Sequence, residues 1–271
     1  NWGSHFRDKV LIHIDDDPSE FGRNFTPTVA VLGDSAAAMR ALVSALDRRH
    51  RTRRHWPRHL RSVEPVMRNG PRKRGLVDPA AAFRLIQRLL PSDARVVVDI
   101  GSSSALAVHH LRINAPQRFY LPLGYACVGH AIAAAVGVRA SSGKQTVVLA
   151  GDAAFLTSAE VHTAVELKLG GLVYVVLNNG GNWMVASGVR QQFGRKHGIE
   201  CGMFRARADI AAIARGMGAR GIVVRTLDEL QSALRAGLDA REPLVIDVQA
   251  QCAAPPMQER VEFLKKARGR S

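Results

Sequence analysis

The chain has 271 residues, of which 46% are hydrophobic, so it can bury the core of one large domain or of one domain and part of another. This composition excludes an intrinsically disordered chain, and no apolar stretch reaches the ~18–20 residues that a membrane span needs. The formal net charge of +15 suggests a nucleic acid or another polyanion as partner. The densest basic run, however, lies between two patterned segments, so we interpret it as a solvated linker and keep polyanion binding as an alternative.

The N-terminal segment predicts two short strands and one helix. Apolar residues over 9–15 and 28–32 indicate the strands, and Ser35 is placed to cap a helix over residues 36–46. We therefore interpret residues 1–47 as the C-terminal remnant of a central α/β domain whose earlier strands are missing from this chain. The chain does not begin with Met and has no signal-peptide core, so we expect a cytoplasmic protein with an unnatural first residue.

The longer C-terminal segment, residues 78–252, alternates predicted strands with predicted helices. Three of the strands are continuous runs of Val, Ile and Leu, which is typical of parallel strands buried on both faces. The fold class is therefore α/β, a doubly wound and mostly parallel sheet with helices on both faces. A basic linker (48–77) precedes this domain and a basic tail (253–271) follows it. The predicted strands are 95–100, 145–150, 172–177, 221–224 and 244–248, and the predicted helices are 102–111, 129–140, 158–169, 209–217 and 227–238.

Polar residues follow two of these strands at the point where each strand ends. Asp152 comes after the strand over 145–150, and Asn179 comes 27 positions later, after the strand over 172–177. Because only one helix joins these strands, the two side chains are expected at neighbouring strand ends, where ligands bind in such sheets. A carboxylate, an amide oxygen and a carbonyl of the glycine-rich turn suit Mg²⁺, whose coordination phosphate oxygens and water complete. Either piece alone is commonly only a turn, but the pair at this spacing is more specific.

This arrangement resembles the motif that binds thiamine diphosphate (ThDP), written GDG followed at a similar distance by NN. Gly151 and Asp152 match its first half and Asn179 its second. Residues 159–166 are similar to the helix inside the motif in acetolactate-synthase-like enzymes, and residues 177–185 to the segment after it. The resemblance extends to the glycine-rich segment that holds the aminopyrimidine (124–137) and to the end of the central domain (15–34), and covers about residues 9–46 and 85–250 in the family's order.

The resemblance implies a role for each matching residue. Asp152 and Asn179 would bind Mg²⁺ through their side chains, and Gly181 through its carbonyl group. Backbone N–H groups beside Asp152 and a loop on the other side would hold the diphosphate, and two further residues would keep the cofactor bent. These expected cofactor-binding residues are Gly151, Ala153 and Ala154 beside the metal, Gly101, Ser102 and Ser103 in the opposite loop, and Ala126 and Val128 at the bend.

The chain departs from the family's pattern at several of these positions. Ala153 replaces the third glycine of the motif, and the serines that begin at Ser102 replace the Gln-His of acetolactate synthases. His130 and Trp183 stand where the family often has Phe and Gly. A histidine near the pyrimidine could carry a proton, which makes His130 a speculative catalytic residue, although such a histidine more often only packs at the start of a helix.

The resemblance implies ThDP- and Mg²⁺-dependent decarboxylation of a 2-keto acid followed by carboligation, a transferase or lyase activity of the acetolactate-synthase type. In that family the glutamate that activates the cofactor lies on a separate pyrimidine-binding domain, which we do not find in this chain. We therefore expect the chain to supply the diphosphate and Mg²⁺ half of the site, to be inactive alone, and to act in a homo- or hetero-oligomer without membrane or nucleic acid. The alternatives are a simple 2-keto acid decarboxylase, an oxidase, and an inactive ThDP-binding module.

Overall fold

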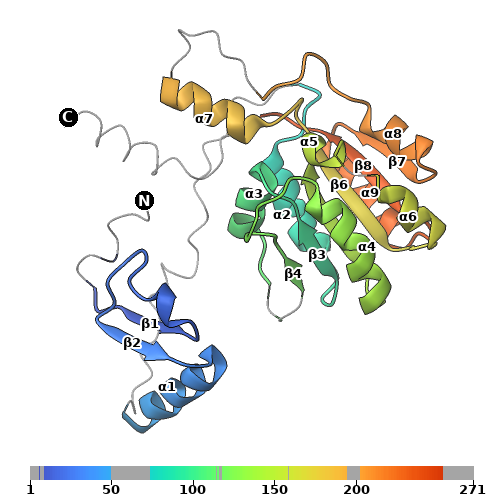
Figure 1. The fold of residues 1–271 in the computed structure, drawn as a ribbon. Coiled ribbons are helices and arrows are strands. Elements are labelled where there is room, and N and C mark those ends of the chain that lie inside the picture. The colour runs from blue at the N-terminus through green and yellow to red at the C-terminus, as the bar shows by residue number, and fades with distance from the viewer. Residues whose placement is uncertain are drawn as a thin grey trace. The chain divides into compact units, whose positions relative to one another are not determined.

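The computed structural model describes residues 6, 9–49, 74–113, 115, 118–157, 159–193 and 202–252 (Figure 1). The chain divides into two compact units, Asn1–Glu64 and Pro65–Ser271. The predicted basic tail and all of the predicted basic linker except its first two and last four residues lie outside the described residues. None of the helices in the described ranges is both long and apolar enough to span a membrane.

The N-terminal unit contains two paired strands and a helix. Strand β1 (Ile12–Asp15) pairs in parallel with β2 (Val29–Leu32), and the short 3-10 helix η1 (Pro18–Glu20) lies between them in the sequence. Helix α1 (Ser35–Arg49) follows. The prediction that Ser35 caps this helix is wrong: the carboxylate of Asp34 accepts the N–H of Ala37 at 2.7 Å, and Ser35 is already helical.

The C-terminal unit contains a six-stranded sheet whose strands are all parallel, in the order β4-β3-β5-β6-β8-β7. This confirms the predicted α/β fold class. The sequence pattern predicts five of the strands and misses the two-residue edge strand β4, which is too short to show a periodic pattern. The strands are β3 (Arg95–Val98), β4 (Phe119–Tyr120), β5 (Thr146–Gly151), β6 (Leu172–Asn178), β7 (Arg220–Val224) and β8 (Leu244–Gln249).

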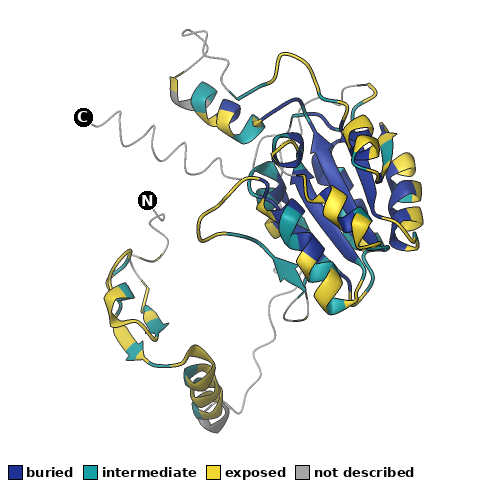
Figure 2. Cartoon of the chain, turned by 45° about the vertical axis from the view of Figure 1, so that its right-hand side comes forward, coloured by how far each residue is buried: buried dark blue, intermediate teal, exposed yellow. Residues whose placement is uncertain are grey.

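Helices cover both faces of this sheet, so its central strands are buried from end to end (Figure 2). All seven residues of β6 are buried, which explains its uninterrupted apolar sequence. One face packs against helices α2 (Pro79–Leu89), α3 (Ser102–His110) and α9 (Leu227–Leu238), and the other against α4 (His130–Ser142), α6 (Val161–Glu166) and α8 (Ile210–Gly216). The short helix α5 (Asp152–Phe155) and helix α7 (Trp183–Phe193) follow β5 and β6.

Three helical segments differ from the sequence-based prediction. The predicted helix over 158–169 is wrong in extent, because the chain forms α5 directly after β5 and only then the shorter α6. Helices α2 and α7 were not predicted. For α2 a signal exists: Asp78 precedes Pro79, and its carboxylate accepts the N–H of Ala81 at 3.2 Å, as at a capped helix start.

Two helical glycines form a matched pair for testing how closely α9 packs on the sheet. A Cβ on Gly237 in α9 would lie 2.6 Å from Leu244 Cδ2 and 2.9 Å from Val173 Cγ2, whereas a Cβ on Gly137 in α4 meets no atom within 4 Å. We expect Gly237→Ala to lower the free energy of unfolding by about 1–3 kcal/mol through overpacking. We expect Gly137→Ala to raise it by about 0.5–1 kcal/mol. Urea denaturation measures both, and similar effects at the two positions would contradict the close packing.

Candidate functional site

The carboxyl ends of β5 and β6 meet at one edge of the sheet, where Asp152 joins them. The two strands pair in register up to Gly151 opposite Leu177, so the residues that follow each strand are neighbours. Asp152 Oδ2 accepts the N–H groups of Gly180 at 2.7 Å and Gly181 at 2.8 Å, and Oδ1 accepts the N–H of Ala153 at 2.9 Å. The Asp152 side chain, which is 1% exposed, is therefore tied to the glycine-rich turn after β6.

Glycine is required in this turn for steric reasons. Gly181 has a φ of +137°, and a Cβ added to it would lie 2.5 Å from the carbonyl oxygen of Gly202. The segment around Gly202 closes over the turn, where Phe204 N–H donates to the carbonyl of Gly180 at 2.8 Å. The backbone of the turn is thus held between Asp152 on one side and residues 202–204 on the other.

Asn179 places an unsatisfied acceptor beside the carboxylate. Its Oδ1 is buried and has no hydrogen-bond partner within the chain, a condition that costs about 1–3 kcal/mol. The carboxylate of Asp152 offers about four acceptor sites and uses three for N–H groups, so one stays available. The Gly181 carbonyl accepts one N–H, from Trp183 at 3.0 Å, and keeps its second lone pair. These three oxygens suit a hard divalent cation such as Mg²⁺.

In the described part of the chain, no group of three or more His, Cys, Asp and Glu side chains is arranged to hold a metal ion. Burial raises the pKa of Asp152, and the N–H groups of Gly180, Ala153 and Gly181 together with the charge of Arg207 oppose that rise. Arg207 lies behind the turn, where its guanidinium donates to the carbonyl groups of Asn178 at 3.0 Å and Ala250 at 3.1 Å.

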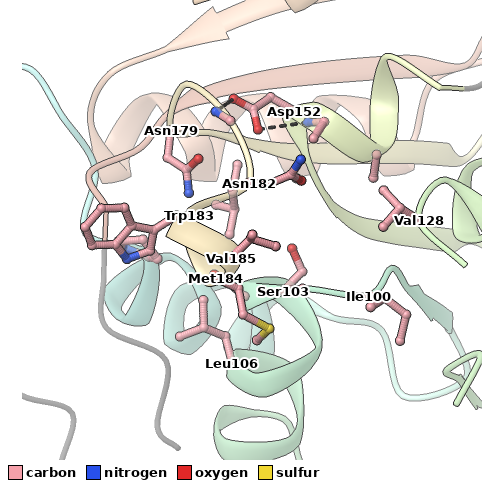
Figure 3. A pocket seen from close by; sticks show the side chains of 18 residues that line it. Ile100, Ser103, Leu106, Val128, Asp152, Asn179, Asn182, Trp183, Met184 and Val185 are labelled. Carbon is pink, nitrogen blue, oxygen red and sulfur yellow. Dashed lines mark hydrogen bonds between the residues drawn. The ribbon is translucent and has the colours of Figure 1, made fainter. Parts of the chain in front are cut away.

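A pocket of about 140 Å³ opens in front of this carboxylate (Figure 3). Asp152 and Asn179 point into it, and Ser103 and Leu106 of α3 line it across from them. The residues predicted from the sequence that line this pocket are Gly101, Ser102, Ser103, Val128, Gly151, Asp152, Ala153, Ala154, Asn179 and Gly181. Sequence reasoning missed the apolar wall formed by the start of α7, namely Trp183, Met184 and Val185.

Helix α3 contributes backbone donors to the same pocket. Gly101, with a φ of +118°, is its N-cap and provides no side-chain hydrogen bond to the first turn. The first N–H groups of a helix attract anions. On the opposite side Ala153 N–H is already engaged by Asp152 Oδ1. Anion binding by that N–H would therefore compete with a local hydrogen bond.

Two of the predicted residues, Ala126 and His130, do not line the pocket. Ala126 is exposed and adopts a left-handed backbone conformation with φ of +55°. His130 is exposed at the first position of α4. Val128, between them, reaches the pocket and is 47% exposed. Of these three residues only Val128 lines the pocket, and Ala126 and His130 are exposed at the surface.

Asp99 is a buried residue that sequence reasoning missed. It follows β3 and is 0% exposed, and its two carboxylate oxygens accept the N–H groups of Gly129 at 3.0 Å and Ala131 at 2.8 Å. This fixes the start of α4, and with it Val128, against the loop that begins at Gly101. Burial raises the pKa of Asp99, and the two N–H groups oppose the rise. An aspartate directly after an apolar strand was the available signal.

Comparison with known proteins agrees with this geometry. Residues 99–248 match the family model described as "Thiamine pyrophosphate enzyme, C-terminal TPP binding domain". The chain therefore belongs to the thiamine pyrophosphate enzyme family, as the sequence resemblance predicted.

Several acetolactate synthases are similar to most of the chain. It is 27% identical to a catabolic acetolactate synthase of Raoultella terrigena over 88% of its length and 43% of that protein. It is 26% identical to an acetolactate synthase of Bacillus subtilis, over 89% of the chain and 42% of that protein. It is 29% identical to an acetolactate synthase large subunit of Parasynechococcus marenigrum, over 88% of the chain and 39% of that protein. The chain thus spans about two fifths of these relatives' lengths.

The buried carboxylate of Asp99 gives a pH-dependent prediction. Because the folded-state pKa of Asp99 is raised above 3.8, the folded chain keeps this proton at pH values where the unfolded chain has lost it. The protonated carboxyl therefore contributes to stability at low pH, and this contribution is lost as pH rises through the folded-state pKa. In Asp99→Asn the side chain at this position cannot ionise, so its contribution to stability does not change with pH. Between about pH 4 and the raised pKa, we expect the wild type to lose stability relative to Asp99→Asn, with a constant difference at higher pH. Urea denaturation of both proteins across this range measures it; a difference independent of pH would contradict the prediction.

Proposed function

We propose that this chain binds ThDP with Mg²⁺ in the pocket between α3 and the turn after β6. The observation that carries this proposal is the buried, unpartnered Oδ1 of Asn179 beside the carboxylate of Asp152. A metal ion at that point would satisfy the acceptor and balance the buried negative charge. Asp152 and Asn179 would hold Mg²⁺ through their side chains, and Gly181 through its carbonyl group.

The diphosphate would lie between the metal ligands and the start of α3. The N–H groups that follow Gly101 lack a side-chain cap, which leaves them available to phosphate oxygens, and the hydroxyl groups of Ser102 and Ser103 supply further donors. Ala154 would contribute a backbone N–H from the other side. Val128 would contact the cofactor where it bends, because Asp99 holds the adjoining backbone.

The reaction that we propose is decarboxylation of a 2-keto acid with carboligation, as in acetolactate synthases. ThDP, when bound, supplies the electron sink for the decarboxylation. The chain's part is to hold the diphosphate and to exclude water, for which the apolar wall of Trp183, Met184 and Val185 is suited. The similarity to three acetolactate synthases supports carboligation over simple decarboxylation.

We further propose that the activating glutamate comes from a pyrimidine-binding domain outside residues 1–271, within an oligomer. The relatives are more than twice as long as the part that this chain matches. The N-terminal unit supports its interpretation as part of a larger domain. Its apolar residues Val29 and Leu32 on β2 are 47% and 61% exposed, although a two-stranded sheet of this kind needs such residues buried to be stable by itself.

Asn179→Ala separates metal binding from stability. Because Oδ1 has no partner within the chain, its removal breaks no internal hydrogen bond of that atom, and we expect the free energy of unfolding to fall by no more than about 1 kcal/mol from the wild-type value. Mg²⁺-dependent binding of ThDP should nevertheless be lost. Isothermal titration calorimetry of ThDP with and without Mg²⁺, together with urea denaturation, measures the two effects.

Two controls accompany this variant. Asp152→Ala should also abolish Mg²⁺-dependent binding, but with a stability loss of about 2 kcal/mol or more, because the N–H groups of Gly180 and Gly181 lose their acceptor. Asp93→Ala removes an exposed carboxylate that pairs with Lys144 before β3 and β5, at the strand ends away from the pocket, and should change neither binding nor its metal dependence. Unaltered Mg²⁺-dependent binding by Asn179→Ala would overturn the proposed metal site.

The isolated chain should be inactive. We expect no CO₂ release from pyruvate with ThDP and Mg²⁺ above that of a sample without protein, because in this proposal the group that activates the cofactor lies outside residues 1–271. Addition of a pyrimidine-binding domain of an acetolactate synthase is the matched test for restored turnover. Robust CO₂ release by the chain alone would refute the division of the site.

A further inference from the structure

A buried polar network lies behind the turn that carries Asn179, and its centre is Asp247 on the neighbouring strand β8. Asp247 is 1% exposed. Its Oδ1 accepts the side-chain amide groups of Asn178 at 3.0 Å and Gln249 at 2.9 Å, and its Oδ2 accepts the N–H of Ile210 at 3.2 Å. One carboxylate thus connects the end of β6, the end of β8 and the start of α8, which lie together in the fold (Figure 1).

Asn178 is the residue through which this network reaches the turn. It is the last residue of β6 and is 0% exposed. Its side-chain Nδ2 donates to Ala208 O at 2.8 Å as well as to Asp247, and its carbonyl oxygen accepts Arg207 Nη1 at 3.0 Å. Its side-chain Nδ2 and its backbone carbonyl are therefore anchored, although its Oδ1 is buried without a partner, and the peptide that follows leads directly into Asn179.

The position of a carboxylate here needs a physical reason, because its strand neighbours Val245, Ile246 and Val248 are buried and apolar. Desolvation makes a buried carboxylate costly, and burial indeed raises the pKa of Asp247. Capping α8 is part of the reason, because Asp247 accepts the N–H of Ile210 while the side chain of Asp209 accepts the N–H of Ala212 at 2.8 Å in the same first turn. Beyond this cap, Asp247 also accepts the side-chain amide of Asn178, which links the start of α8 to the end of β6.

We propose that Asp247 is a positioning residue for the metal-binding turn: by holding Asn178, it sets the direction in which Asn179 and Gly181 present their oxygens. This rests on the proposed function, in which those two residues bind Mg²⁺. Asp247 touches neither the metal ligands' oxygens nor the pocket, so its effect passes through Asn178. Groups that hydrogen-bond a metal ligand directly typically change metal affinity about 10–100-fold when removed, and because Asp247 acts one residue further back, we expect an effect at the lower end of that range.

The test compares two carboxylates that cap the same helix. In the full chain with saturating ThDP, Mg²⁺ is titrated by calorimetry into wild type, Asp247→Ala and Asp209→Ala, and thermal unfolding is recorded for each. We expect Asp247→Ala to weaken Mg²⁺ binding about 10-fold or more. Asp209→Ala should leave the Mg²⁺ dissociation constant within about two-fold of the wild type while lowering the unfolding temperature, because it loses a helix cap and a nearby charge but keeps the hydrogen bond between Asp247 and Asn178.

A double-mutant cycle shows whether the effect passes through Asn178. Asn178→Ala removes the link but leaves Asp247 free to accept Ile210 N–H, and it should weaken Mg²⁺ binding about as much as Asp247→Ala. The double variant should be no worse than either single one. If Asp247→Ala does not fold by circular dichroism, Asp247→Leu takes its place. That variant fills a similar volume among apolar strand neighbours but offers Asn178 no acceptor, and the same loss of affinity is expected.

Three results would overturn the inference: Mg²⁺ affinity within two-fold of the wild type in the folded Asp247 variant, equal weakening by Asp209→Ala, or additive losses in the double variant. The proposed function fails differently, because the wild type itself would then show no Mg²⁺-dependent binding of ThDP. The wild-type titration therefore distinguishes failure of the site from failure of the positioning role.

Discussion

The geometry of the candidate site depends on one carboxylate that joins two strand ends. Asp152 leaves β5 and accepts the N–H groups of Gly180 and Gly181, which follow β6. These hydrogen bonds offset part of the cost of burying a negative charge, and they leave one of its acceptor sites for a cation. They also orient the turn so that the buried amide oxygen of Asn179 stays without a partner in the chain. A fold optimised only for stability would not keep both a buried charge and an unsatisfied acceptor at one point.

Buried carboxylates that accept backbone N–H groups also occur at two other strands of the sheet. Asp99 after β3 accepts the N–H groups at the start of α4, and Asp247 in β8 accepts the N–H of Ile210 at the start of α8. In all three cases burial raises the pKa of the carboxyl group and backbone N–H groups counteract it. Each carboxylate connects a strand to a segment at least 28 positions away. The edge of the sheet where ligands are expected is thus connected to its neighbouring segments by directional side-chain hydrogen bonds, whereas apolar packing holds the helices on the two faces of the sheet.

Directional anchors suit a site that has to bind a charged cofactor. Apolar contacts tolerate small shifts at little cost, but a carboxylate with two or three N–H donors has a narrow range of favourable geometries. The residues that would hold ThDP and Mg²⁺ come from the start of α3, the segment before α4, the end of β5 with α5, and the turn after β6, so their relative positions depend on such anchors. Membership of the thiamine pyrophosphate enzyme family provides a functional reason for retaining these costly groups.

The sequence by itself determined the fold class and the two halves of the candidate site. Continuous apolar runs identify β5, β6 and β8, and the spacing of Asp152 and Asn179 across one helical connection places them at adjacent strand ends. Both signals are local, because a run of apolar residues or a turn after a strand is visible in a short window. The cap of α1 could also have been read locally, and Asp34 was the residue to choose.

Only the tertiary structure decided which groups are paired and which are left without a partner. The contact of Asp247 with Asn178 joins residues 69 positions apart, and nothing in the sequence near either residue encodes it. The orphaned oxygen of Asn179 and the closure of residues 202–204 over Gly181 likewise depend on segments brought together by the sheet. A hydrogen bond forms or fails within a few tenths of an ångström, and the packing of the entire sheet sets positions at that scale.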